Sequence, residues 1–402
     1  MSLRSLPALF MRGGTSKALV FDATVLPHNL AERDAIILAA MGSPDPFGRQ
    51  LDGMGGGVSS LSKVCIVGPS SHKDADIDFT FAQVSVTEPK VDYAGNCGNM
   101  ISAMGPAALI FGHVRAEGAE ARIRIHNTNT SRIIVATFPV SDGLLAVNGD
   151  LAIDGVAGCA ARIRLDFLEP GGAKSGQLLP TGTPIDILSL PDGTRVAATL
   201  VDAANPCVFV AAADLEKTAT EHPEALAHDA AFLGRMEAIR QAGSVQMGLA
   251  PDLPAAARMA SLPKIAIVAP PATTALLSGE AMQASEMDLL VRMISMEQPH
   301  RAIPITGAIC LALACRIDGT IPARLARKVD GPLTLSHPSG SILVDASTAQ
   351  TSGPPHALSG TVYRTSRLLF SGYVHYRLSA TGFAPSAPVM PEAHATSFAT
   401  SS

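Results

Sequence analysis

Short apolar runs separated by glycine-rich turns make up the first half of the chain. Residues 61–68 and 77–86 either alternate apolar and polar positions or are continuously apolar, and residues 18–21 form a shorter run of the same kind. These patterns are typical of β-strands. Residues 30–40 instead carry a helical pattern, and they lead into a very turn-rich stretch that ends in the glycines of residues 53–57. We therefore predict strands with short connections, and a helix between the first two of them.

Two further segments each combine a glycine turn with an apolar helix. Residues 93–112 pass from such a turn into small apolar residues, over a length sufficient for a buried helix. In the second half, strand-like residues 196–212 are followed much later by residues 304–317, again a turn that opens into a short apolar helix. The layout recurs with little residue identity, so it predicts an internal duplication with its boundary near residue 183.

The size of the chain agrees with this duplication. Its 402 residues exceed what one compact core usually holds and suit two domains of ordinary size. With 35 glycines and 29 prolines between Val- and Ile-rich runs, the fold class expected is a strand-rich α+β protein. We predict an N-terminal domain over residues 1–183, a C-terminal domain over residues 184–380, and a disordered Ala-, Pro- and Ser-rich tail over residues 381–402.

Composition narrows the class of function. Hydrophobic residues make up 47% of the chain and charged residues 16%, which is typical of a well-packed soluble enzyme. A net charge of −5 argues against nucleic-acid binding, so an anionic ligand needs a few local donors. No apolar stretch approaches the roughly 20 residues that span a bilayer, so no membrane partner is expected. The six cysteines show no CxxC pairs, which disfavours disulfides and structural zinc and points to a reducing, cytoplasmic setting.

Cys97 lies in the sequence N-C-G-N at the start of the predicted 93–112 helix. A cysteine among small residues is more often a packed core residue than a catalyst. Here two amide side chains and a glycine surround the thiol, which suits an anion-binding turn better than a core. Free N–H groups and the dipole at a helix N-terminus lower a thiol pKa. We therefore interpret Cys97 as a candidate proton-transfer group, and the other cysteines, which lie in apolar runs, as core residues.

Lys63 lies inside an otherwise strand-like run. The simplest interpretation is a solvated residue that faces outward on an edge strand. Its neighbours Ser59, Ser60 and Ser62 and the glycine loop before them support a functional one. A lysine whose pKa is lowered by desolvation can act as a general base, or as the acid that protonates the far end of an allylic system.

Several turns combine glycine with hydroxyl, amide or cationic side chains and are candidates for binding an anion. The R-G-G-T-S-K turn at 12–17 lacks the spacing of a phosphate-binding P-loop, so a carboxylate is the expected ligand. Among the others, Arg301 has slightly more weight because a guanidinium binds carboxylates bidentately. The candidate substrate-binding residues are Arg12, Thr15, Ser16, Ser60, Asn96, Gly98, Asn99, Met247, Gly248, Arg301, Thr306, Gly307, His337 and Ser339.

Several common catalytic motifs are missing from the chain. It has no Ser-His-Asp order, no HExxH, no paired metal-ligand run and no dinucleotide-binding GxGxxG after a strand. This argues against a hydrolase, a metalloenzyme and a dehydrogenase, and neither a metal nor a cofactor is expected.

A set of ordered motifs between about Met11 and Val374 resembles the PrpF family, which shares the diaminopimelate epimerase fold. That family includes 2-methylaconitate isomerase, 3-methylitaconate isomerase, 4-oxalomesaconate tautomerase and aconitate Δ-isomerase. The resemblance is carried by MRGGTSK, GSPDPFGRQLDGMGGG, SSLSK, FAQV, DYAGNCGNM, MGL, HPSG and RTSRLLFSGYV.

The resemblance implies two similar domains, each a strand-rich barrel around a central helix, with the site between them at both helix N-termini. It also implies that Lys63 and Cys97 are the family's acid/base pair. In diaminopimelate epimerase each domain contributes one cysteine, and the second position falls here near Pro304, where no thiol is present. This difference favours an allylic isomerase over an epimerase.

The hypothesis is therefore a cofactor-independent isomerase that shifts a C=C bond in an unsaturated di- or tricarboxylate. Residues 291–307 favour acids of the aconitate or 2-methylaconitate type over 4-oxalomesaconate. Two alternatives stay open: an amino-acid epimerase or racemase, and a non-catalytic accessory protein for a dehydratase. The sequence also leaves open whether the protein forms a homodimer.

Overall fold

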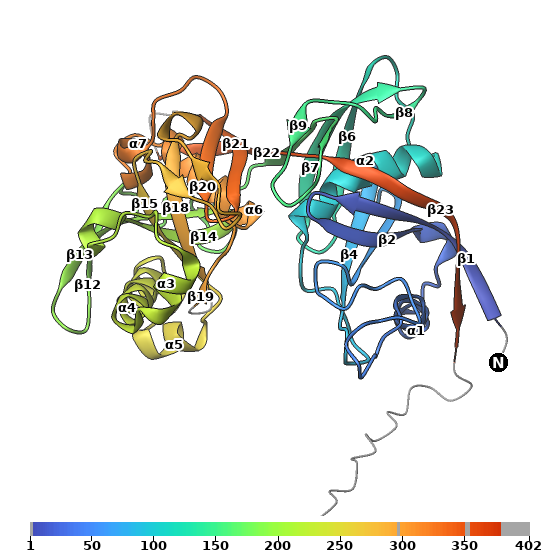
Figure 1. Ribbon diagram of the computed structural model, residues 1–402, viewed down its shortest axis with the longest axis horizontal. Helices are drawn as coiled ribbons and strands as arrows, with labels where there is room; N and C mark the ends of the chain where they lie inside the picture. Colours follow the sequence, from blue (N-terminus) through green and yellow to red (C-terminus); the bar gives the residue numbers. More distant parts are fainter. Residues whose placement is uncertain (1–2, 296–297, 350–353, 379–402) are drawn as a thin grey trace, which may run out of the picture.

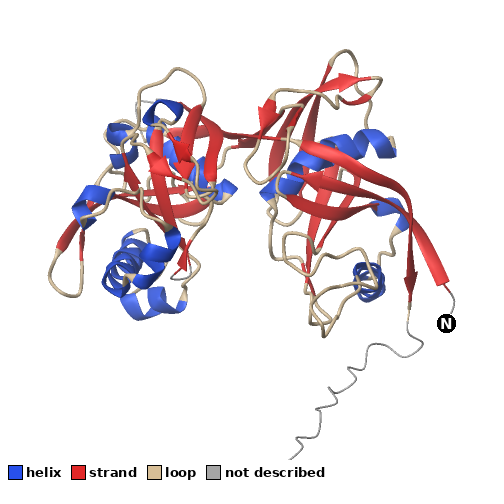
Figure 2. Cartoon of the chain, viewed as in Figure 1, coloured by secondary structure: helices blue, strands red, loops and turns tan. Residues whose placement is uncertain are grey.

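The computed structural model describes residues 3–295, 298–349 and 354–378, and these residues form two lobes (Figure 1). Strands make up most of both lobes, with a few helices inside and around them (Figure 2). The predicted tail over residues 381–402 lies outside the described residues. None of the described helices has the length and hydropathy needed to cross a bilayer.

The N-terminal lobe is a barrel in which each strand pairs with the next. Going round it, the pairings are antiparallel, parallel, antiparallel, parallel, antiparallel and antiparallel. Helix α2 (Gly98–Phe111) lies inside this barrel. The strands, in the order of pairing, are β1 (Leu3–Gly13), β2 (Ser16–Asp22), β3 (Lys63–Pro69), β4 (Ile77–Val84), β6 (Glu120–Asn127), β7 (Arg132–Ser141) and β11 (Ile163–Leu168).

The C-terminal lobe repeats the same order of parallel and antiparallel pairs. Helix α6 (Ile305–Arg316) takes the place of α2. This repetition confirms the predicted fold class, α+β with two similar strand-rich barrels around a central helix. The strands are β13 (Arg195–Ala203), β14 (Asn205–Ala211), β15 (Lys264–Ala269), β18 (Leu289–Ser295), β20 (Leu333–His337), β21 (Gly340–Ala349) and β22 (His356–Arg364).

The remaining elements lie outside the two barrels or extend their sheets. Helix α1 (Leu30–Met41) connects β2 to β3, and the helices α3 (Pro223–His228), α4 (Ala230–Gln246) and α5 (Leu253–Arg258) occupy the equivalent connection in the C-terminal lobe. The short elements are β5 (Val91–Asp92), β8 (Leu144–Leu145), β9 (Leu151–Ala152), β10 (Cys159–Ala160), β12 (Asp186–Ser189), β16 (Thr274–Ala275), β17 (Ala281–Met282), β19 (Gln298–Pro299), α7 (Ile321–Leu325) and three 3₁₀ turns, Ala23–Val25, Ala212–Leu215 and Ala284–Glu286.

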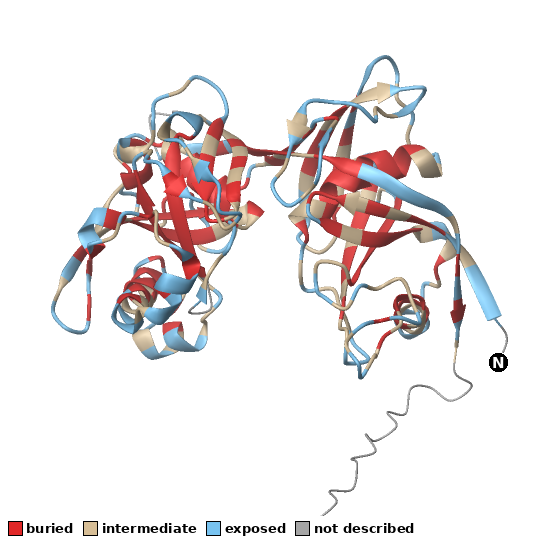
Figure 3. Ribbon diagram, in the orientation of Figure 1, coloured by how far each residue is buried: buried red, intermediate tan, exposed pale blue. Residues whose placement is uncertain are grey.

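The central helices are buried because they are built from small and apolar residues, as the sequence predicted (Figure 3). In α2, a side chain at Gly105 would lie 2.7 Å from the ring of Phe138, so the glycine lets the barrel wall approach closely. Helix α2 ends at Gly112, whose left-handed φ of 80° suits glycine. Residues of α2 and α6 belong to one hydrophobic cluster that continues through both lobes.

The two lobes are joined by strands as well as by the core. β22 pairs with β21 on one side and with β11 on the other. The chain then continues directly into β23 (Ser366–Arg377), which pairs along the whole of β1 (Figure 1). The last described strand therefore completes the N-terminal lobe, although it lies in the range 184–380 that we predicted as the second domain. The boundary near residue 183 itself remains a prediction.

Candidate active site

The N-termini of α2 and α6 meet at the junction of the two lobes. Cys97 is the N-cap residue of α2 and Pro304 that of α6, and neither helix has a side-chain cap. A side chain at Gly98 would lie 2.9 Å from Ile305, so the first turns of the two helices are in contact. Uncapped helix N-termini present free N–H groups and a positive partial charge, which favours an anionic ligand between them.

Cys97 lies at this junction with an extended backbone (φ −122°, ψ 94°) and a 9% exposed side chain. Its position at a helix N-terminus is as predicted. The thiol lies 3.9 Å from the hydroxyl of Ser16, another predicted site residue. A thiol at the lobe junction, in contact with a hydroxyl at a helix N-terminus, can exchange a proton with a bound substrate.

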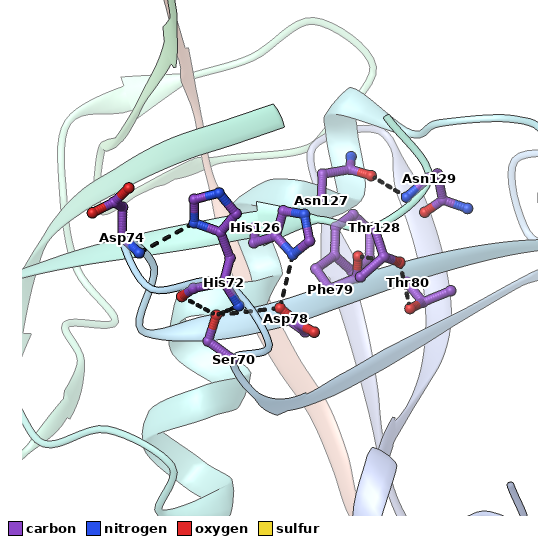
Figure 4. Close-up of polar contacts among 10 residues, drawn as sticks. All are labelled: Ser70, His72, Asp74, Asp78, Phe79, Thr80, His126, Asn127, Thr128 and Asn129. Carbon is purple, nitrogen blue, oxygen red and sulfur yellow. Dashed lines mark hydrogen bonds and ion pairs between the residues drawn. The ribbon is translucent and has the colours of Figure 1, made fainter. Parts of the chain in front are cut away.

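A pair of asparagines that we did not predict holds the turn before Cys97. Asn127 donates to the side-chain oxygen of Asn96 at 2.8 Å. Its own side-chain oxygen accepts the N–H of Asn129 at 3.0 Å (Figure 4). The Asn129 amide in turn donates to the carbonyls of Phe81 (2.9 Å) and Tyr93 (2.7 Å). These bonds fix the turn against β4, so Asn127 and Asn129 position Cys97.

Lys63 is the first residue of β3, which lies between β2 and β4. Along β3, Val64 and Ile66 pack in the cluster around α1, whereas Cys65 and Val67 pack in the cluster around α2. Because side chains alternate along a strand, Lys63 is on the α2 side. Its residue is only 8% exposed. The alternative of a solvated residue on an edge strand therefore does not hold.

Polar and aromatic neighbours hold the Lys63 ammonium group. Its Nζ donates to the side-chain oxygen of Gln83 at 2.7 Å and lies 5.1 Å from the ring centre of Phe81. Gln83 is itself oriented by the carbonyls of Ser59 and Ser62, to which its amide donates at 3.1 and 2.8 Å. Ser59 and Ser62 thus use their backbone carbonyls to orient Gln83, and Gln83 in turn holds Lys63.

Lys63 and Cys97 both lie near the buried thiol of Cys65. Burial raises the pKa of the Cys65 thiol well above its usual range, the nearby Cys97 raises it further, and the nearby Lys63 lowers it. Both candidate groups therefore lie within electrostatic range of the same buried side chain. Cys65 itself stays a protonated core thiol and has no part in the chemistry.

The R-G-G-T-S turn packs directly on the first turn of α2. A side chain at Gly13 would lie 2.7 Å from the Asn99 carbonyl oxygen, and one at Gly14 would overlap the Asn99 side chain, so only glycine fits here. The Asn99 amide donates to the Thr15 hydroxyl at 3.0 Å. Arg12 holds this turn in place by donating to the Gly14 carbonyl at 2.9 Å, among other bonds.

The structure therefore gathers the predicted N-terminal candidates around the start of α2. The backbone of Ser60 joins them, because its carbonyl accepts the N–H of Lys17 in β2 at 3.2 Å. The candidates brought together in this lobe are Arg12, Thr15, Ser16, Ser60, Lys63, Asn96, Cys97, Gly98 and Asn99.

In the C-terminal lobe, hydrogen bonds join two of the predicted binding segments, the one that contains Arg301 and the one that contains Ser339. Both the backbone N–H and the hydroxyl of Ser339 donate to the Arg301 carbonyl, at 3.0 and 2.6 Å. Two residues on, the N–H of Ser341 donates to Asp154 of the N-terminal lobe at 2.6 Å. The His337–Ser339 turn and Arg301 therefore lie where the two lobes touch.

Thr306 and Gly307 lie in the first turn of α6, as predicted. A side chain at Gly307 would lie 2.8 Å from the end of Met293, so this glycine allows close packing. Met247 and Gly248, in contrast, form the C-terminal end of α4, where Gly248 has φ 71°. Met247 packs in the core cluster around α4, which contains no residue of α2 or α6. The structure does not bring this pair to the site, and their glycine ends a helix instead of forming a donor turn.

Arg364 is a functional candidate that sequence reasoning missed. Its Nε donates to the side-chain oxygen of Asn99 at 3.2 Å, beside the first turn of α2. Burial lowers the Arg364 pKa to about 10. Burial, and then the charges of Arg292 and Arg364, lower the pKa of His337 to about 4, so this imidazole is neutral near pH 7. The only sequence signal was that Arg364 opens the R-T-S-R-L-L-F run used for the family resemblance.

Two similar barrels whose central helices meet at their N-termini, with a cysteine at the start of one of them, make up an α+β fold with a candidate proton-transfer site at the junction of the lobes. Comparison with known proteins gives the family. Residues 3–377 match the family model described as PrpF protein, and the chain belongs to the PrpF family.

Several relatives are similar along nearly their whole length. The chain is 37% identical to 2-methyl-aconitate isomerase of Shewanella oneidensis, covering 91% of this chain and 96% of that one. It is 38% identical to 3-methylitaconate isomerase of Eubacterium barkeri (92% and 97%) and 38% identical to 4-oxalomesaconate tautomerase of Pseudomonas putida (93% and 97%). Among solved structures, methylitaconate-delta-isomerase matches with a TM-score of 0.88 and 36% identity, over 96% of this chain and 100% of that chain.

Proposed function

We propose that this isomerase moves a C=C bond along an unsaturated di- or tricarboxylate of the aconitate or 2-methylaconitate type. The observation that carries the proposal is the placement of Cys97 and Lys63 around one buried residue, beside the N-terminus of α2. The substrate class is supported by the named substrates of the relatives, all of which are unsaturated acids with more than one carboxyl group.

The proposed reaction needs two proton-transfer groups. One of Lys63 and Cys97 removes a proton from the allylic carbon, and the electron pair delocalises through the double bond into the adjacent carboxylate. The other group donates a proton at the far end of the allylic system, and the C=C bond ends one carbon away. Free N–H groups at the starts of α2 and α6 stabilise the negative charge that develops in between. Exchange with solvent then returns both groups to their starting protonation states, with no requirement for a cofactor.

An amino-acid racemase with two opposed thiols fits the site less well. The residue of α6 that corresponds to Cys97 is Pro304, the N-cap of that helix. Cys310 lies further along α6, fully buried, with its thiol 3.4 Å from the Val201 carbonyl. Burial raises the pKa of Cys310 well above its usual range. This thiol is therefore a core residue that cannot serve as a second base.

The proposal is tested by incubating the purified protein with a panel of acids: trans-aconitate, 2-methylaconitate, itaconate, methylitaconate and mesaconate. We expect at least one acid of the aconitate type to be converted to an isomer of the same mass, seen by proton NMR as movement of the vinyl signal. If no acid in the panel changes, the isomerase assignment for this substrate class is wrong and the accessory-protein alternative is favoured.

Two further points go with this proposal. The six cysteines are all free in the structure, which supports a reducing, cytoplasmic location. A homodimer remains a prediction that sedimentation of the purified protein would test.

A further inference from the structure

Arg364 occupies the point where the chain leaves one lobe for the other. It is the last residue of β22, and in the sheet register it pairs with Ile163 of β11 in the N-terminal lobe. Two residues later, at Ser366, β23 begins its pairing with β1. The guanidinium therefore lies at the lobe junction, on a backbone that pairs with strands of both lobes.

The guanidinium is anchored at one side and unpaired at the other. Its Nε donates to Asn99, and its Nη1 donates to the Tyr363 carbonyl at 2.8 Å. Within the described residues, Nη2 has no hydrogen-bond partner, and no carboxylate lies within the 4.0 Å of an ion pair. The Nη2 group and the second N–H of Nη1 thus form a free edge with the fork geometry that binds a carboxylate.

The positive charge of Arg364 is disfavoured by its surroundings unless an anion binds to it. Burial is the cause of its lowered pKa, and no acid offsets it, yet at about 10 the group is still cationic at neutral pH. The Arg364 side chain is partly exposed, so a carboxylate that reaches its free edge would supply the missing counter-charge.

The side chains facing Arg364 favour the same ligand. Asn99, which holds Nε, also bonds Thr15, so the arginine is tied to the R-G-G-T turn. From the C-terminal lobe, His337 lies within electrostatic range, is 6% exposed, and has its Nδ1 atom buried without a partner in the described structure. Arg292 is the other charged group near His337. Asp154 lies beside the His337 turn, but it already accepts the Ser341 N–H. No acid contributes to the pKa of Arg364 itself, so its free edge favours an anion over a cation.

We propose that Arg364 binds a carboxylate of the substrate at the first turn of α2, with His337 facing the same group from the other lobe. The inference rests on the proposed function for the identity of the substrate, and it adds a residue that determines how the acid is held. With one carboxylate on Arg364, the carbon chain is held beside Cys97, which is the N-cap of the helix whose first turn contains Asn99. Only a multiply charged acid would use both this arginine and the free N–H groups at the helix ends.

The first test separates binding from chemistry. In Arg364→Gln protein we expect KM for the converted acid to rise about 10- to 100-fold, because a charge-assisted hydrogen-bond pair is lost, with a smaller change in kcat. Arg364→Lys keeps the positive charge but loses the two parallel N–H donors. Its KM should lie between those of wild type and Arg364→Gln protein. Arg195→Gln, which removes an exposed cation at the start of β13, is the matched control and should leave KM unchanged.

The second test does not depend on turnover. Tricarballylate, a saturated tricarboxylate without a C=C bond to move, is titrated into each protein by calorimetry. We expect wild type and Arg195→Gln to bind it, and Arg364→Gln to bind at least about 10-fold more weakly. If wild type isomerises no acid but binds tricarballylate in this Arg364-dependent way, the proposed function fails and the Arg364 site stands.

Two results would overturn the site. One is equal tricarballylate affinity and KM in wild type and in Arg364→Gln protein that unfolds at the same temperature. The other is no tricarballylate binding by wild type. If Arg364→Gln protein does not fold, Arg364→Lys protein is the test. Tricarballylate affinity equal to that of wild type would show that the guanidinium does not bind the carboxylate, and would overturn the site.

Discussion

Cys97→Ala protein should fold normally and lose nearly all turnover, with kcat lowered by about 10²- to 10⁴-fold or more, the usual contribution of a general acid or base. The reason is that no other group can replace the thiol. Cys65 is buried and held protonated, and the Ser16 hydroxyl that lies 3.9 Å from the Cys97 thiol is a far weaker acid. Steady-state kinetics with the converted acid measures the effect, and thermal unfolding shows whether the variant is intact.

The matched control for the thiol is Cys159→Ala. We predicted Cys159 as a core residue, but it is exposed in the N-terminal lobe, so its removal should leave kcat unchanged. Cys97→Ser tests the same point with a nearly isosteric group whose pKa is too high for efficient proton transfer at neutral pH. Full activity in a folded Cys97→Ala protein would remove the thiol from the mechanism.

Lys63→Met should have an effect of similar size on kcat, about 10²- to 10⁴-fold, because the second proton-transfer group is lost. This variant should also be less stable. Without the ammonium group, the partly buried side-chain oxygen of Gln83 loses the 2.7 Å bond, a loss that costs about 1–3 kcal/mol of unfolding free energy. Kinetics and urea unfolding measure the two effects separately.

Lys73→Met is the matched control for this lysine, because it changes an exposed lysine in the turn at the opposite end of the β3–β4 hairpin. A second variant, Lys63→Arg, keeps a cation for Gln83 but cannot release its proton near pH 7, so it should be stable and inactive. Wild-type turnover in folded Lys63→Arg protein would show that Lys63 acts only as a positive charge.

Much of the local structure could be predicted from the sequence, because it follows from short-range patterns. The helix expected over residues 30–40 is α1, Leu30–Met41, and the one expected within 93–112 is α2, Gly98–Phe111. The turn-to-helix change at N-C-G-N placed Cys97 at a helix N-terminus, and in the structure Cys97 is the N-cap residue of α2. The duplication was visible only as a repeated layout, whereas the structure shows it in the identical order of strand pairing in both lobes.

Other features depend on contacts between distant residues, which leave no local pattern. β23 pairs with β1 across more than 350 residues, and nothing in its apolar sequence indicates that partner. The β3 run is apolar on both faces, so alternation could not show which way Lys63 points. Arg364 looked like any charged residue in a strand, because its significance comes from the missing acid around it.

The place of Met247 and Gly248 at the end of α4 reflects a related ambiguity. A glycine after an apolar residue fits either a donor turn or a helix C-terminus, and only the preceding helix decides between them. Here α4 runs to Gln246, and Gly248 follows its C-cap. Asn127 and Asn129 were missed because their role is to hold a turn some thirty residues away, by bonds to Asn96 and Tyr93.

The central claim is that two different groups, Lys63 and Cys97, remove and deliver the proton. It is tested most directly by running the isomerisation in heavy water and locating deuterium in the product by NMR. Because the donating group exchanges with solvent before each turnover, we expect one deuterium at the carbon that receives the proton, in nearly every product molecule. Product free of deuterium after complete conversion would mean that one shielded group carries the same proton between the two carbons, and would contradict the account.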